Sequence, residues 1–395
     1  MGSVRKSIPI LSALMVLSIA FGTMRVVAQD DDPIIIGAPV HLTGWMAAYD
    51  TPPLEGAQLA VQVINEAGGV LGRPLEIMAI DGRTDPATVG NAAIEVIDAG
   101  AEVLLAPCDF DYGAPVGQAA QAAGLVGVSF CASSPLYGSD ALGDLQFTAS
   151  MWNQTMSSAA AEFAVAQGWT TGALIVDTTT EYTQSLGEYF AEAFTHFGGE
   201  VVLDDTYLQG DNQIDAQIQR LEGLGTPPDV IFLSTNMPDY AMMVRELRSA
   251  GFEQPLMGGD AMDTVEFYPA VGEDLGNNIF ISTHSFVGPG VGPEMDEFLA
   301  LYEAEYGNPP ETAFAVMGWD AVQILAQAIE AAGTTEGAAV AAAMEETPYS
   351  LLSGELTWTN AEEGHFPNKE AFILEVVDGA PTFVETLLPS WTPET

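Results

Sequence analysis

Short apolar runs alternate with amphipathic segments along the chain from residue 34 onward. A short apolar run between turn residues is typical of a buried strand, and apolar residues three or four positions apart are typical of a helix. Asp85 and Pro86 mark one helix start, because Asp is a favoured N-cap residue and Pro is favoured at the next position. The pattern predicts strands at residues 34–37, 75–80, 103–106 and 125–130, with helices at 54–67, 85–99 and 114–123.

The same alternation returns in the second part of the chain, where Gly198-Gly199 repeats the punctuation of Gly68-Gly69. Alternating strands and helices predict an α/β fold, in which helices cover both faces of a central parallel sheet. We therefore predict two similar lobes, the second beginning near Ser150 and the first completed by later helices. Strands are expected at residues 173–176, 201–203, 230–233 and 256–257, with helices at 183–197, 214–224, 240–250, 293–306, 314–332 and 335–346.

The first 28 residues have the layout of a secretory signal peptide and are not expected to belong to the fold. Arg5 and Lys6 precede an apolar run at residues 8–21, and small or modest residues lead to a cleavage point near Ala28. The alternative is a membrane anchor, but this run is short for a span of about 20 apolar residues. The mature chain is therefore expected to be exported.

The charge of the chain excludes several partners. It has 55 acidic and 9 basic residues, a formal net charge of −46, and 16% charged residues in all. A typical soluble protein has roughly 25%, so the imbalance is a shortage of bases. Without clusters of Lys or Arg, we expect neither nucleic acid nor an anionic membrane surface as a partner. Adaptation to an acidic habitat and adaptation to a salty one both remain open.

Two cysteines, Cys108 and Cys131, each follow an apolar run that is predicted to be a strand. An even number of cysteines in an oxidising compartment favours a disulfide. If the two runs are neighbouring parallel strands, their ends lie within bonding distance. The alternative is a pair of free, buried thiols.

Motifs for catalysis and metal binding are missing from the sequence. It contains no G-x-S-x-G, no P-loop and no G-x-G-x-x-G after a strand, and its four histidines lack metal-ligand spacing. Asp109 and Asp111 could serve acid–base chemistry, but no nucleophile lies beside them in the sequence. We therefore expect a binding protein and not an enzyme, with no cofactor and no metal.

An ordered set of short motifs carries a family resemblance: LTG at residues 42–44, EGA at 55–57, NEAGGVLG at 65–72 and DP at 85–86. On these motifs the chain resembles the type I periplasmic solute-binding proteins, and within them the leucine/isoleucine/valine-binding branch of ABC importers. The resemblance covers essentially the whole mature chain. It implies a periplasmic monomer that captures a small-molecule ligand between two lobes and delivers it to a membrane permease with its ATPase.

The resemblance also implies how the lobes are divided. Two Rossmann-like lobes are joined by three crossovers, expected near residues 148–150, 281–283 and 353–355. The N-terminal lobe would comprise residues 29–149 plus 283–353, and the C-terminal lobe residues 150–282 plus 354–395.

The residues that would contact a ligand follow from the same resemblance. The loops at residues 108–109 and 131–133 correspond to positions that hold the carboxylate of an amino acid, and Asp260 to the acid that pairs with its ammonium group. The implied ligand-binding residues are Tyr49, Cys108, Asp109, Cys131, Ala132, Ser133, Trp152, Tyr182, Asn236, Asp260 and Phe314.

Three of these positions depart from the family pattern. Asp109 stands where a neutral donor is usual and would repel a ligand carboxylate; Trp152 replaces an acid and Asn236 an aromatic residue. An acidic, aromatic cleft, which suits an ammonium group, would be formed by Asp109, Asp111 and Asp260 with Trp45, Tyr49, Trp152 and Tyr182. A cationic amine, a betaine or an amide therefore stays open as the ligand beside an amino acid. A ligand-sensing partner of a membrane receptor and a secreted hydrolase are further alternatives.

Overall fold

A computed structural model gives the structure of residues 1–2 and 32–394. Apart from its first two residues, the expected signal peptide, with its cleavage point near Ala28, lies outside the described residues. Within the described part of the chain, none of the helices combines the length and the apolar character that a membrane span requires.

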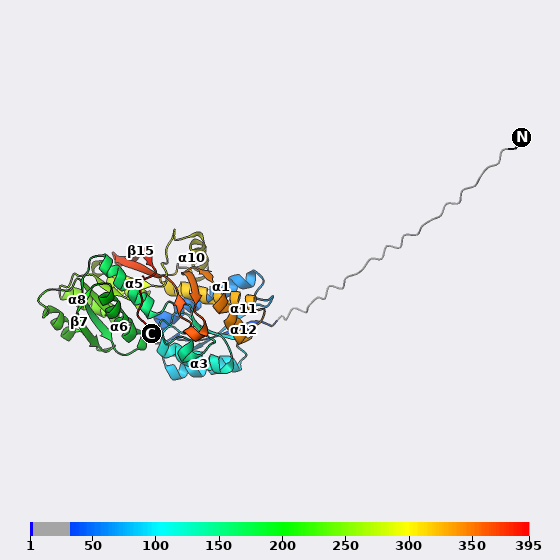
Figure 1. The fold of residues 1–395 in the computed structure, drawn as a ribbon, viewed down its shortest axis with the longest axis horizontal. Coiled ribbons are helices and arrows are strands. Elements are labelled where there is room, and N and C mark those ends of the chain that lie inside the picture. Colours follow the sequence, from blue (N-terminus) through cyan, green and yellow to red (C-terminus); the bar gives the residue numbers. More distant parts are fainter. Residues whose placement is uncertain (3–31, 395) are drawn as a thin grey trace.

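Two lobes lie side by side, each built on its own sheet (Figure 1). The sheet of the first lobe has five parallel strands. Its strand order places the second strand at one edge and the first beside it, as in doubly wound folds. In spatial order the strands are β2 (Leu75–Asp81), β1 (Ile34–Val40), β3 (Val103–Ala106), β4 (Gly127–Ser129) and β5 (Gln146–Thr148).

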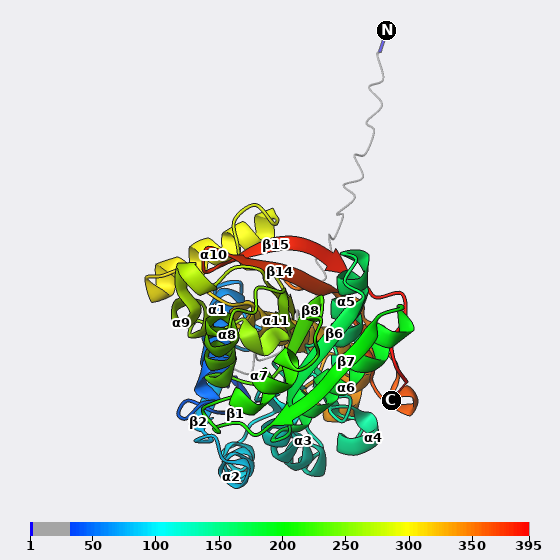
Figure 2. The same cartoon turned by 90° about the vertical axis from the view of Figure 1, so that its left-hand side faces the viewer.

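The sheet of the second lobe repeats this order over its parallel strands and adds two antiparallel strands at one edge. Figure 2 shows the added strands β14 and β15, in red, along one margin of the lobe. In spatial order the strands are β7 (Glu200–Tyr207), β6 (Thr171–Asp177), β8 (Val230–Ser234), β9 (Leu256–Gly258), β10 (Ile279–Thr283), β14 (Ala371–Val377) and β15 (Ala380–Leu387). The repeated order confirms the prediction of two similar lobes.

Helices cover both faces of each sheet, as predicted. In the first lobe, α2 and α3 pack on one face, and α1 and α11 on the other. In the second lobe, α5 and α6 share a face. The helices are α1 (Ala47–Glu66), α2 (Pro86–Asp98), α3 (Phe110–Ala123), α4 (Ser139–Leu142), α5 (Asn153–Ala166), α6 (Glu181–His196), α7 (Asp215–Glu222), α8 (Asp239–Ser249), α9 (Phe267–Leu275), α10 (Pro293–Tyr306), α11 (Ala313–Ala332) and α12 (Gly337–Glu346).

Helices α1 and α11 approach each other backbone to backbone. A Cβ atom on Gly56 would lie 1.9 Å from the carbonyl oxygen of Ala315, and one on Gly318 would lie 1.7 Å from that of Pro53. Only glycine permits such an approach. The contact fixes the start of each helix against the other, and these starts carry Tyr49 and Phe314.

The chain passes three times between the lobes. The first passage follows β5 and leads into α5, and the second follows β10 and leads into α10. The third was expected at residues 353–355, but there the chain turns between β11 (Tyr349–Leu351) and β12 (Gly354–Trp358). Trp358 holds β12 beside the first sheet, because its Nε1 donates to the Thr148 carbonyl oxygen at 3.0 Å. The third passage instead lies between β13 (Pro367–Asn368) and β14.

The boundaries of the lobes remain a proposal, and the strand pairing of β11, β12 and β14 refines them. We keep residues 29–149 plus 283–353 in the first lobe and residues 150–282 in the second. We transfer residues 354–368 to the first lobe, because β12 pairs with β11 and contacts α12. Residues 371–394 stay in the second lobe, where β14 pairs with β10.

Candidate functional site between the lobes

A small cavity lies between the lobes, beyond the carboxyl ends of the parallel strands. Ligands of open α/β sheets bind at this edge. Its volume is about 20 Å³, room for roughly one water molecule, so a larger ligand requires the lobes or side chains to move. The cavity is lined by Met46, Tyr49, Cys108, Asp109, Cys131, Tyr182, Asn236, Asp260, Ala261 and Phe314.

The cavity brings together eight of the eleven residues that the resemblance implies. Ala132, Ser133 and Trp152 are not among its lining residues. A larger groove of about 650 Å³ lies along α10 and α11, but it contains none of the implied ligand residues. We therefore take the small cavity as the candidate site, because both lobes supply its walls.

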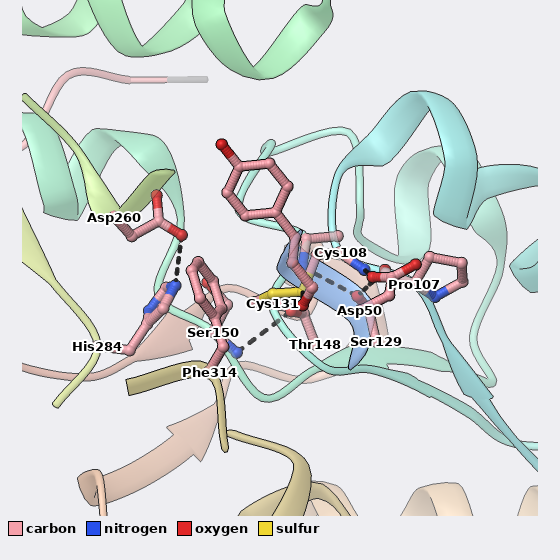
Figure 3. Close-up of a disulfide and its surroundings, with 12 residues drawn as sticks. Asp50, Pro107, Cys108, Ser129, Cys131, Thr148, Ser150, Asp260, His284 and Phe314 are labelled. Atoms are coloured by element: carbon pink, nitrogen blue, oxygen red, sulfur yellow. Dashed lines mark hydrogen bonds and ion pairs between the residues drawn. A yellow bond between two sulfur atoms is a disulfide. The ribbon is translucent and has the colours of Figure 1, made fainter. Parts of the chain in front are cut away.

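Asp260 is the charged centre of the second-lobe wall. Its Oδ1 accepts a hydrogen bond from the Tyr182 hydroxyl at 2.7 Å. Its Oδ2 lies 2.8 Å from Nε2 of His284 (Figure 3). His284 is fully buried, and within the described part of the chain its Nδ1 has no partner. We therefore assign the proton of this contact to Nε2 of His284. Two donors thus hydrogen-bond the Asp260 carboxylate, and neither Lys nor Arg is among the residues that line the cavity.

Tyr49 joins the two lobes at the cavity. Its hydroxyl accepts from the Met237 N–H at 2.7 Å and donates to the Ala261 carbonyl oxygen at 3.1 Å. Burial raises the pKa of Tyr49 well above its usual range, so the group stays a neutral phenol. Its ring meets Phe314 edge to face at 5.6 Å. These contacts make an aromatic wall that is complete only when the lobes are together.

A second contact across the lobes lies at the mouth of the site. The N–H of Glu181, the first residue of α6, donates to Asp111 Oδ2 at 2.9 Å. A carboxylate at a helix N-terminus is favourable, because it satisfies a backbone donor that lacks a partner within the helix. Asp111 therefore fastens α3 of the first lobe to α6 of the second.

The first-lobe wall is organised by Asp50, a residue that the sequence did not single out. Its Oδ1 accepts from the Cys108 N–H at 2.9 Å and its Oδ2 from the His41 N–H at 2.8 Å. Burial raises the pKa of Asp50 to about 8. The Cys108 N–H is therefore bonded within the protein.

Asp109 is a buried acid in the same wall. It caps the N-terminus of α3, where its Oδ1 accepts from the Asp111 N–H at 2.8 Å. Burial, together with the nearby acids Asp111, Glu181 and Asp50, raises the pKa of Asp109 well above its usual range. A protonated carboxyl group is a hydrogen-bond donor, so the raised pKa of Asp109 reduces the repulsion expected against a ligand carboxylate.

The disulfide between Cys108 and Cys131 is confirmed (Figure 3). Strands β3 and β4 are parallel neighbours, with Leu104 opposite Gly127. Their carboxyl ends therefore lie side by side, and the two Cα atoms are 4.6 Å apart. Because both cysteines line the cavity, the disulfide is part of its wall.

The three implied residues that do not line the cavity contact other parts of the protein. The Ala132 N–H donates to Ser129 Oγ at 2.9 Å, and the Ser133 carbonyl oxygen accepts from the Asn153 N–H at 2.6 Å. Trp152 is buried, and its ring meets Phe366 edge to face at 5.2 Å. Conversely, Met46 and Ala261 line the cavity but were missed, since neither carries a chemical signal in the sequence.

The cavity is acidic and aromatic, with no Lys or Arg among its lining residues. Within the described residues no group of three or more His, Cys, Asp or Glu side chains could hold a metal ion. Two lobes with a carboxylate and aromatic rings between them are typical of a ligand-binding protein.

The chain belongs to the periplasmic binding protein family, whose model matches residues 33–381. A relative, the Leu/Ile/Val-binding protein BraC3 of Rhizobium johnstonii, is 28% identical over 338 residues, which cover 85% of this chain and 88% of the relative. The family match confirms the resemblance that the sequence motifs carried.

Two solved structures show the same fold. The branched-chain amino acid transporter substrate-binding protein LivJ from Streptococcus pneumoniae, in complex with isoleucine, has a TM-score of 0.82 and 22% identity, covering 91% of this chain and 100% of that chain. An ABC transporter solute-binding protein from R. palustris, in complex with benzoate, has a TM-score of 0.79 and 22% identity, covering 92% and 98%. Because their ligands differ, the fold alone does not choose the ligand.

Proposed function

We propose that the chain is the exported substrate-binding component of an ABC importer, and that its ligand is a branched-chain or related hydrophobic amino acid. The observation that carries the proposal is the Asp260 carboxylate, which faces the cavity and is held by Tyr182 and His284. Because no Lys or Arg lines the cavity, this carboxylate favours a ligand that brings an ammonium group. Tyr49 and Phe314 supply apolar surface for the ligand's side chain.

Capture would proceed by closure of the lobes. The ligand touches both walls only in the closed arrangement, so it stabilises that arrangement relative to the open one. We propose that a monomer in this closed form is what a membrane permease and its ATPase recognise. The chain would reach the periplasm through its signal peptide, cleaved near Ala28. We propose binding without turnover, because the site combines no nucleophile with an adjacent base.

A cationic amine, betaine or amide is the second candidate ligand. It is favoured by Asp109, which adds another acid to the cavity opposite Asp260. Without Lys or Arg in the lining, such a ligand would meet carboxylates and aromatic faces. The two candidates differ in whether the ligand carries a carboxylate.

A thermal-shift screen over amino acids, polyamines, betaines and amides tests the proposal. We expect hydrophobic amino acids to raise the melting temperature, since a ligand that binds only the folded state stabilises it. Asp260→Asn should abolish this rise, whereas Asp177→Asn, which alters a buried acid outside the cavity, should retain it. A rise with amines or amides alone would replace the proposed ligand class. An unchanged rise in Asp260→Asn would remove this residue from the site.

A further inference from the structure

The second passage between the lobes begins with residues that are bonded to the cavity. Three consecutive side chains, Ser282, Thr283 and His284, each reach a different partner. Ser282 Oγ donates to the Met156 carbonyl oxygen at 3.0 Å, and Thr283 Oγ1 donates to Asp263 Oδ2 at 3.3 Å. His284, the first residue after β10, pairs with the Asp260 carboxylate at 2.8 Å. The start of the passage is thereby connected to the turn that carries Asp260.

That turn has little local structure to fix its side chains. It is a single turn of 3-10 helix, Asp260–Met262, which follows Gly258-Gly259 and has no side-chain cap. The Asp260 carboxylate is therefore oriented by its two side-chain partners, one on each oxygen. Tyr182 belongs to α6, within the second lobe, whereas His284 belongs to the passage that leads to the first lobe.

We propose that His284 is a positioning residue that couples the arrangement of the lobes to the orientation of the ligand-facing acid Asp260. The inference rests on the proposed function, in which Asp260 binds the ligand's ammonium group. When the lobes close, His284 Nε2–H holds Oδ2, so that the carboxylate faces the cavity as an anion. When they open, rotation about the passage moves His284 and releases one oxygen, which weakens the grip on the ammonium group.

The His284 side chain has features that fit this role. It is fully buried, and its ring centroid lies 6.2 Å from that of Phe314, another cavity residue. Only Nε2 makes a hydrogen bond among the described residues, since Nδ1 has no partner there. A glutamine amide can replace an Nε2 donor, so His284→Gln preserves the interaction while His284→Leu removes it at similar volume.

The chain supplies a matched control in His365. Its Nε2 also lies 2.8 Å from a carboxylate oxygen, that of Glu345, and its ring is also buried. It lies away from the cavity, stacked on Phe147. His365→Gln therefore alters a comparable pair without touching the site.

The test compares L-leucine with 4-methylpentanoate, which has the same side chain but no ammonium group, by calorimetry and competition. In His284→Leu we expect leucine to bind about tenfold or more weakly, since hydrogen bonds to charged groups contribute strongly, while 4-methylpentanoate is nearly unaffected. His284→Gln and His365→Gln should keep the preference for leucine. Equal weakening of both ligands in His284→Leu, or loss of the preference in His365→Gln, would overturn the proposal, because a structural role produces that result.

A ligand-free measurement separates this inference from the proposed function. In nitrogen-15 spectra, His284 should show a slowly exchanging Nε2 proton, whose signal Asp260→Asn shifts. If leucine does not bind the wild type but this signal is present and changes with added ligands from the screen, the positioning role stands and the ligand class fails. If Asp260→Asn leaves the His284 signal unchanged, the inference is wrong whatever the ligand.

Discussion

Burial decides the chemistry of the acids around the cavity. Asp109 and Asp50 look alike in the sequence, yet Asp50 accepts two backbone N–H groups and Asp109 accepts one. Both have a raised pKa because water is excluded. In both groups burial favours the neutral carboxylic acid over the carboxylate, relative to an exposed aspartate.

The pH dependence of affinity reveals which ligand Asp109 serves. If the ligand carries a carboxylate, protonated Asp109 donates to it, and affinity should fall as the pH rises and the proton is lost. Asp109→Asn keeps a donor that does not titrate, so its affinity for leucine should depend less on pH between pH 5 and 9. Titration calorimetry over that range measures both proteins. Affinity that rises with pH in the wild type, and drops in Asp109→Asn, would show that Asp109 acts as an anion for a cationic ligand.

Sequence reasoning found most lining residues but not what holds them. Asp260 and Tyr182 could be predicted as ligand residues because the family resemblance marks their positions. Asp50 and His284 were missed, since each acts through a hydrogen bond to a residue 24 to 58 positions away in the chain. Trp152, which the resemblance implied as a ligand residue, does not line this cavity, and its ring contacts Phe366; its role at the site stays a prediction.

At the scale of elements, strands and helices with one clear period were predictable. The strand at residues 103–106 and the helix at 293–306 match β3 and α10. Helix α5 was missed because nearly every side chain along it is buried, which leaves no polar face to reveal its period. The antiparallel strands β14 and β15 were missed as well, because pairing between distant segments leaves no mark in the local sequence.

The disulfide links the ends of β3 and β4 and forms part of the cavity wall. Its removal should therefore affect both stability and ligand binding. Closing a loop with a sequence separation of 23 residues stabilises the fold by about 3 kcal/mol in the chain-entropy view. The variant with Cys108→Ser and Cys131→Ser should melt several degrees lower and bind leucine more weakly, as should the reduced wild type. Thermal melting and calorimetry with and without reductant measure this. Unchanged affinity in the double variant would show that the disulfide serves stability alone.

At the scale of the whole molecule, two effects make the stability depend on pH: repulsion among the many acidic groups and the burial of some of them. The proposed leader carries three of the nine basic residues, so the chain without it has six bases against 55 acids. Uniform negative charge repels itself and destabilises the compact state, and this repulsion weakens as carboxylates protonate. The buried acids add a second effect of the same sign.

These groups predict that stability is greatest between about pH 4 and 6. The pKa of Asp50 is raised to about 8 and that of Asp263 to about 6, both by burial. Each group's contribution to the free energy of unfolding is fully present below the ordinary carboxyl pKa. It is lost as the pH rises through the raised pKa. Burial lowers the pKa of His41 to about 4, so its contribution is complete above the ordinary histidine pKa and is lost as the pH falls through 4.

Melting curves at several pH values and salt concentrations test this prediction. The melting temperature should be several degrees higher at pH 5 than at pH 8, and Asp50→Asn should reduce the difference. Retained stability near pH 3–4 supports adaptation to acid, and collapse without salt supports adaptation to a salty habitat. A higher melting temperature at pH 8 than at pH 5 would contradict the assignment of raised pKa values to the buried acids.

Calorimetric titration of the mature chain with L-leucine tests the central claim most directly. The account predicts saturable binding at one site per chain, with a negative heat-capacity change as apolar surface is buried during closure. Asp260→Asn should lose this binding while its melting temperature without ligand changes little. Two results would contradict the account. One is that Asp260→Asn binds leucine as tightly as the wild type does, and the other is that the wild type binds none of leucine, isoleucine and valine.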